Sequence, residues 1–384
     1  MGLGIASADQ GSAASPPAQA AMKSDTPLAA LAGQMKAGTW AVLQTRNFDA
    51  NGLNILVPPI GSSISYITQY SDRGVWDPVS HQFYFCGAAH GEPNQNQSFR
   101  KFVKYSESNN SWSTLPDPGF WTAHSYEHLT INPSTGLIYY REYNSLTVDV
   151  YDIHTGAWGH IPSIPMGANQ VAGALEYFPE RNGLVFVDGD WGIWFFGLSS
   201  NEWTLVAETN GSQKTTLPKL PMGSYDNFSA YSPAAKAVIF GGGNGSTNVY
   251  KMDARGKIST VKNAPFVIGV TMTVVTVDPV SGKILVFTEA QKAYEYDPAT
   301  DTWTPLNIPA APFFTVGVDG PVAGTVAAPI SNYGVVMFVN YEHSGNSQVY
   351  LYKHSASRSG SMDKNVKGSA ISSLPPALTT ERRP

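Results

Sequence analysis

The clearest structural signal lies in the stretch Glu295-Tyr296-Asp297-Pro298-Ala299-Thr300-Asp301-Thr302-Trp303. It predicts a short strand, a tight turn and a second short strand, with a tyrosine seven residues before a tryptophan. The same aromatic spacing recurs at three other places: Tyr105 and Trp112, Tyr151 and Trp158, and Phe196 and Trp203. The tryptophans at positions 112, 158, 203 and 303 are 46, 45 and then 100 residues apart, so one degenerate copy lies in the last interval. A period of this length indicates a repeat architecture.

The composition favours an all-β fold with a weakly charged surface. The 384 residues include 36 Gly and 27 Pro, and only 14% are charged, which predicts many turns and few helices. The net charge is −5 without a basic stripe, so we expect no nucleic-acid partner. A single cysteine, Cys86, excludes an internal disulfide and is expected to be buried in an apolar strand. No segment resembles a signal peptide or reaches the ~20 apolar residues of a membrane helix, so we expect no membrane insertion, and the localisation stays open.

Six repeats can be traced, and the inner strand of each is predicted to stop at a proline, a residue tolerated at strand ends. These prolines are Pro78, Pro133, Pro179, Pro233, Pro279 and Pro329. The sixth repeat supplies only three strands. An orphan strand at residues 38–45, which contains Trp40, is expected to complete it and so close the ring without exposed sheet edges.

Three segments follow from this tracing. Residues 1–34 read as a disordered arm rich in Ala, Ser and Pro, with a short helical piece around Leu28–Met35. Residues 35–354 form the repeat domain, and residues 355–384 form a second disordered tail.

The Gly-rich strand end Ile239-Phe240-Gly241-Gly242-Gly243-Asn244, the inner strands and the Tyr-x6-Trp hairpins together resemble the kelch β-propeller family, over about residues 36–354. Since only the fourth repeat carries the double glycine, the chain resembles a divergent member. The resemblance implies an all-β, six-bladed propeller with four-stranded antiparallel blades, like the central domain of galactose oxidase. The copper ligands of that enzyme include a tyrosine linked to a cysteine, whereas Cys86 lies in an apolar strand and the Tyr-His pair has no equivalent, so we expect no copper or other cofactor.

In such a blade, the loops from the second to the third strand and the loops between blades share one face, which we call the long-loop face. Functional loops on a rigid scaffold tend to be the long ones, so we expect the site on this face. The candidate ligand-binding residues are Arg73, His124, Glu127, Asn144, Asp188, Asp190, Trp191 and Asn227. We expect no metal site. His124 and His128 on one strand would lie about 13 Å apart, too far to share a metal. Asp188 and Asp190 supply too few carboxylates for calcium and favour a turn.

Two functions remain open. The first is a non-catalytic recognition or structural module that binds a protein or glycan partner through the long-loop face, with arms that tether it in a larger assembly such as a virion. The alternative is a polysaccharide-active enzyme, for which we consider a uronate lyase. In it an arginine would neutralise the carboxylate while a histidine or tyrosine moves protons. Its candidate catalytic residues are His90, His128, Tyr140, Tyr143 and Arg141. The lack of a complete catalytic motif favours the first function, and the oligomeric state stays open.

Overall fold

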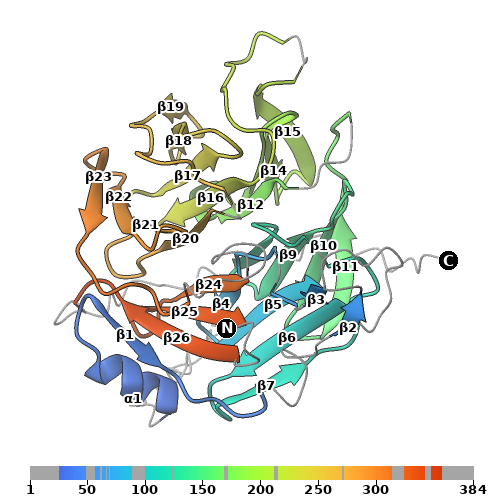
Figure 1. Cartoon of the computed structure of the whole chain (residues 1–384). Helices are drawn as coiled ribbons and strands as arrows, with labels where there is room; N and C mark the ends of the chain where they lie inside the picture. Colours follow the sequence, from blue (N-terminus) through green and yellow to red (C-terminus); the bar gives the residue numbers. More distant parts are fainter. Residues whose placement is uncertain are drawn as a thin grey trace, which may run out of the picture.

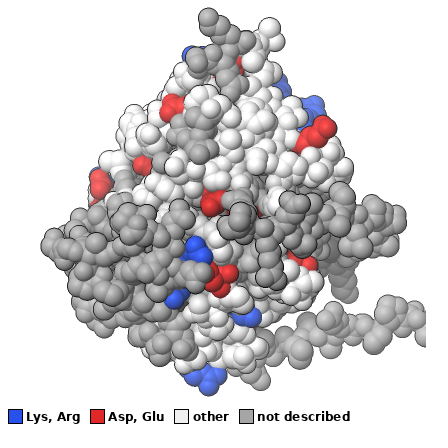
Figure 2. Space-filling view, turned by 90° about the vertical axis from the view of Figure 1, so that its right-hand side faces the viewer, with Lys and Arg blue, Asp and Glu red and all other residues white. Residues whose placement is uncertain are grey.

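The computed structural model describes residues 26–48, 57–60, 63–65, 67–68, 70–88, 100–122, 124–167, 172–211, 215–269, 272–313, 324–341 and 347–356. Six four-stranded antiparallel sheets are arranged in a ring, so the predicted six-bladed propeller is confirmed (Figure 1). No helix in these ranges is long and apolar enough to cross a membrane. On the side shown in Figure 2, the charged side chains that are described are scattered, with basic and acidic groups side by side.

Blades 1 to 5 are each built from four consecutive strands, ordered from the channel outward, whereas blade 6 takes three consecutive strands and the first strand of the chain. Blade 1 is β4 (Val75–Asp77), β5 (Gln82–Ala88), β6 (Arg100–Ser106) and β7 (Ser111–Thr114). Blade 2 is β8 (Leu129–Asn132), β9 (Leu137–Arg141), β10 (Val148–Asp152) and β11 (Ala157–Ile161). Blade 3 is β12 (Ala174–Phe178), β13 (Gly183–Asp188), β14 (Gly192–Gly197) and β15 (Glu202–Ala207).

The other blades follow the same order. Blade 4 is β16 (Asn227–Ser232), β17 (Ala237–Gly242), β18 (Val249–Met252) and β19 (Ile258–Thr260). Blade 5 is β20 (Thr273–Val277), β21 (Ile284–Thr288), β22 (Ala293–Asp297) and β23 (Thr302–Leu306). Blade 6 is β24 (Thr325–Ile330), β25 (Val335–Tyr341), β26 (Ser347–Lys353) and β1 (Thr39–Val42). A short 3-10 helix, η1 (Pro179–Arg181), follows β12, and the hairpin of β2 (Val57–Ile60) and β3 (Ser63–Ser65) stands outside the blades.

The seven-residue spacing of the aromatic pairs follows from the outer hairpin of each blade. In blade 5, Tyr296 and Trp303 are directly opposite each other, with ring centroids 4.9 Å apart. The Trp303 Nε1–H donates to the carbonyl of Lys262 in the connection from blade 4, at 2.9 Å. Trp203 does the same in blade 3: its ring packs on Phe196 with centroids 5.0 Å apart, and its Nε1–H donates to the carbonyl of Pro162 in the connection from blade 2, at 2.7 Å. In the degenerate blade 4, Ile258 faces Met252 and the turn is one residue shorter.

Ring closure by the start of the chain is confirmed. The strand β1 pairs with β26, and Trp40 lies opposite Tyr352 with ring centroids 4.6 Å apart (Figure 1, blue beside red). The Trp40 Nε1–H donates to the carbonyl of Pro309 at 3.3 Å, which repeats the arrangement of Trp303. The two ends of the described chain therefore supply the tryptophan and the tyrosine of the fifth aromatic pair, which lies in blade 6.

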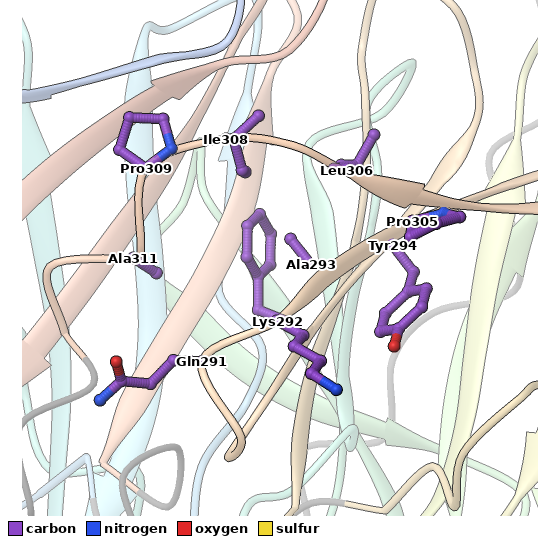
Figure 3. Close-up of a pocket in the computed structure, with 10 residues that line it drawn as sticks. Gln291, Lys292, Ala293, Tyr294, Pro305, Leu306, Ile308, Pro309 and Ala311 are labelled. Atoms are coloured by element: carbon purple, nitrogen blue, oxygen red, sulfur yellow. The ribbon is translucent and has the colours of Figure 1, made fainter.

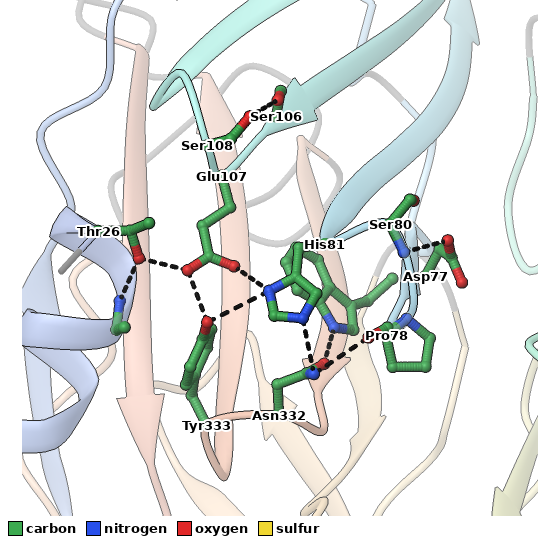
Figure 4. A network of polar contacts seen from close by, with 12 residues as sticks. Thr26, Asp77, Pro78, Ser80, His81, Ser106, Glu107, Ser108, Asn332 and Tyr333 are labelled. Atoms are coloured by element: carbon green, nitrogen blue, oxygen red, sulfur yellow. Dashed lines mark hydrogen bonds and ion pairs between the residues drawn. The ribbon is translucent and has the colours of Figure 1, made fainter. Parts of the chain in front are cut away.

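The short helical piece expected around Leu28–Met35, at the end of the segment predicted to be a disordered arm, is the helix α1 (Pro27–Gln34). Thr26 caps it by accepting a hydrogen bond from the Ala29 N–H at 3.2 Å, and Leu28 is fully buried in the core. A polar network fixes this end to the propeller (Figure 4). The Glu107 carboxylate in it accepts from the hydroxyl of Thr26 and, at 2.6 Å, from Tyr333 of blade 6. Burial of the apolar face explains why this segment joins the fold.

The sixth inner strand differs slightly from expectation, because β24 continues past Pro329 to Ile330. The Ala327 N–H, two residues earlier, donates to the carbonyl of Asp72 in blade 1 and not to β25. Pro329 lies on the same side of the strand, so its missing N–H removes no bond from the ladder with β25.

Candidate functional site

The inner strands of neighbouring blades approach closely enough to bond to one another around the channel. The Gly74 N–H donates to the Ala327 carbonyl at 3.0 Å, and the Leu175 N–H donates to the Glu127 carbonyl at 2.9 Å. The Ala327 N–H donates to the Asp72 carbonyl, which joins blade 6 to blade 1. The Asp72 N–H donates to the Tyr126 carbonyl, which joins blade 1 to blade 2. Blades 6, 1, 2 and 3 are therefore linked in this way. Side chains from several blades consequently meet at the centre of the ring.

Arg73, two residues before the blade 1 inner strand β4, occupies this centre. Its Nη1 donates to the Leu175 carbonyl at 2.8 Å and to Glu176 Oε2 at 2.9 Å. Its Nη2 donates to Glu127 and to the Ser229 carbonyl. One guanidinium thus connects blade 1 to blades 2, 3 and 4. The predicted ligand-binding residues Arg73 and Glu127 are paired with each other.

Three carboxyl groups share this guanidinium. Burial raises the pKa of Glu127 to about 7, and the nearby Arg73 charge opposes the rise. Burial likewise raises the pKa of Glu176, and the pKa of Asp72 is raised by burial, by Glu127 and by Asp226. As the pH rises above about 7 and Glu127 loses its proton, the carboxylates of Glu127 and Glu176 outnumber their common cation, and the centre of the channel gains a negative excess.

A cavity of about 340 Å³ opens on the face opposite the long loops, and we call it the proline-ringed cavity. All six inner-strand prolines line it: Pro78, Pro133, Pro179, Pro233, Pro279 and Pro329. Arg73 and Glu176 lie in its wall together with the hydroxyl-bearing residues Thr130 and Thr276. No site was expected on this face, although the recurrence of the prolines was the signal that could have found it.

On the long-loop face, four rings form an aromatic cluster: Tyr70, His124, Tyr126 and Tyr143. The His124 ring lies between Tyr70 and Tyr143, with centroid distances of 5.3 and 4.7 Å. Its Nδ1 is 2.5 Å from the Tyr126 hydroxyl. The first three residues precede inner strands and Tyr143 lies between β9 and β10, so the topology brings them to one end of the channel. Asp226 lies near this cluster, and burial raises its pKa to about 6 while a hydrogen bond from Asn244 opposes the rise.

The other predicted lyase residues lie deeper. His128 and Arg141 are fully buried, with His128 Nε2 and Arg141 Nη1 3.4 Å apart, and burial holds the pKa of His128 well below its usual range. Tyr140 is also fully buried, and its ring stacks on Phe120 with centroids 5.5 Å apart. Tyr143 groups with His124 rather than with these three. The remaining candidate, His90, lies outside the described residues.

The predicted acidic loop of blade 3 is a turn. Asp188 Oδ1 accepts from the N–H groups of Asp190 and Trp191, both at 2.9 Å, and burial raises the pKa of Asp188 to about 6. Asn227, at the start of β16, is linked to this turn, because its Oδ1 accepts from the Gly189 N–H at 2.9 Å. Asn144 is exposed and follows Tyr143 in the chain. Within the described ranges, no three His, Cys, Asp or Glu side chains are grouped to hold a metal ion.

A second, smaller pocket of about 130 Å³ lies at the edge of blade 5 (Figure 3). Gln291 and Lys292 from the β21–β22 turn and Tyr294 of β22 line it, facing the segment that contains Ile308 and Pro309. None of these residues was expected at a site, because they share no motif.

No family model and no curated protein matches the chain. Several solved structures are similar in fold. A Bacteroides thetaiotaomicron VPI-5482 structural genomics protein of unknown function is 14% identical with a TM-score of 0.50, over 82% of this chain and 75% of that one. A fungal alcohol oxidase of the AA5 family, in complex with copper, is 11% identical with a TM-score of 0.43, over 73% of each chain. The nidogen/laminin complex is 10% identical with a TM-score of 0.46, over 64% of this chain and 81% of that one. At these identities the likeness extends to the propeller fold alone.

Proposed function

We propose that this chain is a non-catalytic recognition propeller that binds a glycan or protein partner through its long-loop face. The observation that carries the proposal is the aromatic cluster, in which Tyr70, His124 and Tyr143 are only partly buried and are held side by side. Partly exposed rings present apolar area at low entropic cost, and they are enriched where proteins bind partners. The chain segments before Thr26 and after Ala356 would act as tethers to a larger assembly such as a virion.

The rigidity of the surroundings supports this proposal. His124 is fixed by the Tyr126 hydroxyl, and the Tyr126 N–H in turn donates to the Tyr70 carbonyl at 2.9 Å. Beneath them, Arg73 ties four blades together through its bonds to carboxylates and carbonyls. A preformed surface loses little conformational freedom on binding, which favours recognition.

Charge distribution argues for recognition over uronate elimination. The lyase reaction needs a cation beside the substrate carboxylate and a base that can reach the sugar. Arg73 is already bonded to Glu127 and Glu176, and Arg141 is fully buried. Asp226, next to the aromatic cluster, has a pKa of about 6, so above that pH its carboxylate would repel a uronate. We therefore expect neutral sugars or protein side chains as ligands in preference to uronates.

A glycan array followed by titration of the best ligand tests the proposal. We expect His124→Ala and Tyr143→Ala to weaken binding by roughly tenfold each, since the loss of an aromatic contact of about 1.4 kcal/mol corresponds to a factor of ten. Val79→Ala, which changes an exposed side chain on the opposite face, is the matched control and should bind like the wild type. Equal binding by all three variants would refute the assignment to this face. An unsaturated product released from alginate, ulvan, pectin or glucuronan would establish the lyase alternative instead.

A further inference from the structure

We propose that the proline-ringed cavity is a second binding site, which takes a compact organic cation: an amine with an apolar or aromatic body. It lies at the opposite end of the channel from the aromatic cluster, so it goes beyond the recognition surface proposed above. The size, wall chemistry, charge and hydrogen-bonding capacity of the cavity each contribute to the choice of ligand.

The volume of about 340 Å³ falls within the ~300–1,000 Å³ typical of small-molecule sites. The wall combines the six prolines with aliphatic and aromatic side chains, among them Trp76, Tyr177 and Tyr231. The rings are fixed in place, because Trp76 Nε1–H donates to Asn332 at 2.6 Å and the Tyr231 hydroxyl donates to Glu180 at 2.8 Å. An apolar body fits such a wall, and aromatic rings also attract cations.

The charged side chains in and behind the wall determine whether a cation or an anion is the preferred ligand. Glu176 and Arg73 both line the cavity and pair with each other at 2.9 Å. The same guanidinium is also paired with Glu127 and interacts with Asp72. At pH 8, above the pKa of about 7 of Glu127, the carboxylates of Glu127 and Glu176 carry more negative charge than the one guanidinium that they share can balance. In a low-dielectric wall this excess favours a positively charged ligand and disfavours an anion.

A partly exposed carboxylate in the wall supplies a hydrogen-bond acceptor for such a ligand. Glu176 lines the cavity, and its side chain is 15% exposed although it already accepts from Arg73 and Thr130. A carboxylate has about four lone-pair sites on its two oxygens, so Glu176 can accept a further hydrogen bond. A primary ammonium can donate to this carboxylate, whereas a quaternary ammonium cannot. The geometry thus favours primary amines among organic cations.

Three probes of nearly the same shape test the charge: benzylammonium, benzyl alcohol and benzoate, titrated into the full chain by calorimetry at pH 8. We expect benzylammonium to bind at least tenfold more tightly than benzyl alcohol, and benzoate to give no heat of binding at the same concentration. Equal affinity for the amine and the alcohol would refute the charge argument. If none of the three binds, the cavity is not a ligand site of this class.

Substitutions test whether benzylammonium binds inside the cavity. Ser331→Trp adds a large ring at an exposed lining position and should abolish binding of benzylammonium, while Val79→Trp, on the same face but outside the lining, should not. Glu176→Gln removes a wall charge at nearly constant volume. It should weaken benzylammonium several-fold and leave benzyl alcohol unchanged, so equal effects on both would overturn the role of Glu176. Ser331→Trp should still bind the glycan, so the two proposals, the amine site and the recognition surface, can be tested independently.

Discussion

Replacement of Trp40 by alanine tests whether the two ends of the described chain hold the ring closed. The Trp40 ring lies 5.5 Å from Phe287, 5.2 Å from Phe338 and 4.6 Å from Tyr352, measured between centroids. Its Nε1–H also donates to Pro309. The substitution removes these contacts from the only strand of blade 6 that comes from the start of the chain, among the strands described.

We expect a loss of about 3 kcal/mol in the free energy of unfolding. This is the lower end of the ~3–5 kcal/mol found when buried Phe or Trp is truncated to Ala, and it suits a ring that is partly exposed. With an unfolding entropy of about 2.1 cal/mol/K per residue, roughly 300 folded residues give about 0.6 kcal/mol/K, so Tm should fall by about 5 °C. Differential scanning calorimetry measures this shift.

Trp303→Ala is the matched control, because Trp303 holds the same position in blade 5, whose four strands are consecutive in the chain. It should lower Tm by a comparable amount. Only Trp40→Ala should also release β1 (Thr39–Val42), which limited proteolysis would detect as faster cleavage within residues 26–48 under native conditions. A Tm within about 1 °C of the wild type, or equal cleavage rates in the two variants, would refute the reasoning about closure.

Arg73→Met should lower the free energy of unfolding by about 3–5 kcal/mol at pH 8 in urea titrations, because Glu127 and Glu176 stay buried without their cation. The loss should shrink at pH 5, where these carboxyls take up protons, and an equal loss at both pH values would contradict this cause. In the wild type, the pKa of Glu127 is raised from 4.5 to about 7, so the folded state binds a proton more tightly than the unfolded chain does, and stability from this group declines as pH rises from about 4.5 to about 7. Glu127→Gln should flatten that decline, and an unchanged slope of unfolding free energy against pH would assign it to other groups. Cys86 is 1% exposed and burial raises its pKa, so iodoacetamide should label it only after unfolding, as mass spectrometry can show; rapid labelling of the native protein would contradict its burial.

The architecture was predictable because it rests on local spacing. Tyr296 and Trp303 are neighbours across a hairpin, and any four-stranded blade of the same design repeats that contact at the same interval. The closing strand was predictable for a related reason: a repeat that lacked its tryptophan and an orphan segment around Trp40 complemented each other. The helix α1 (Pro27–Gln34) was only partly anticipated, because its place in the fold depends on contacts with Glu107 and Tyr333 of distant blades.

By itself, then, the sequence determined the number of blades, the strand order and the way the ring closes. Each of these depends on contacts between residues close in the chain or on a repeated pattern. Only the tertiary structure decided that Arg73, Glu127 and Glu176 meet, that His124 joins Tyr143 while His128 is buried with Arg141, and that six prolines surround a cavity. These groups come from different blades, and their distances depend on the tilt and spacing of sheets around the channel, which no local pattern records.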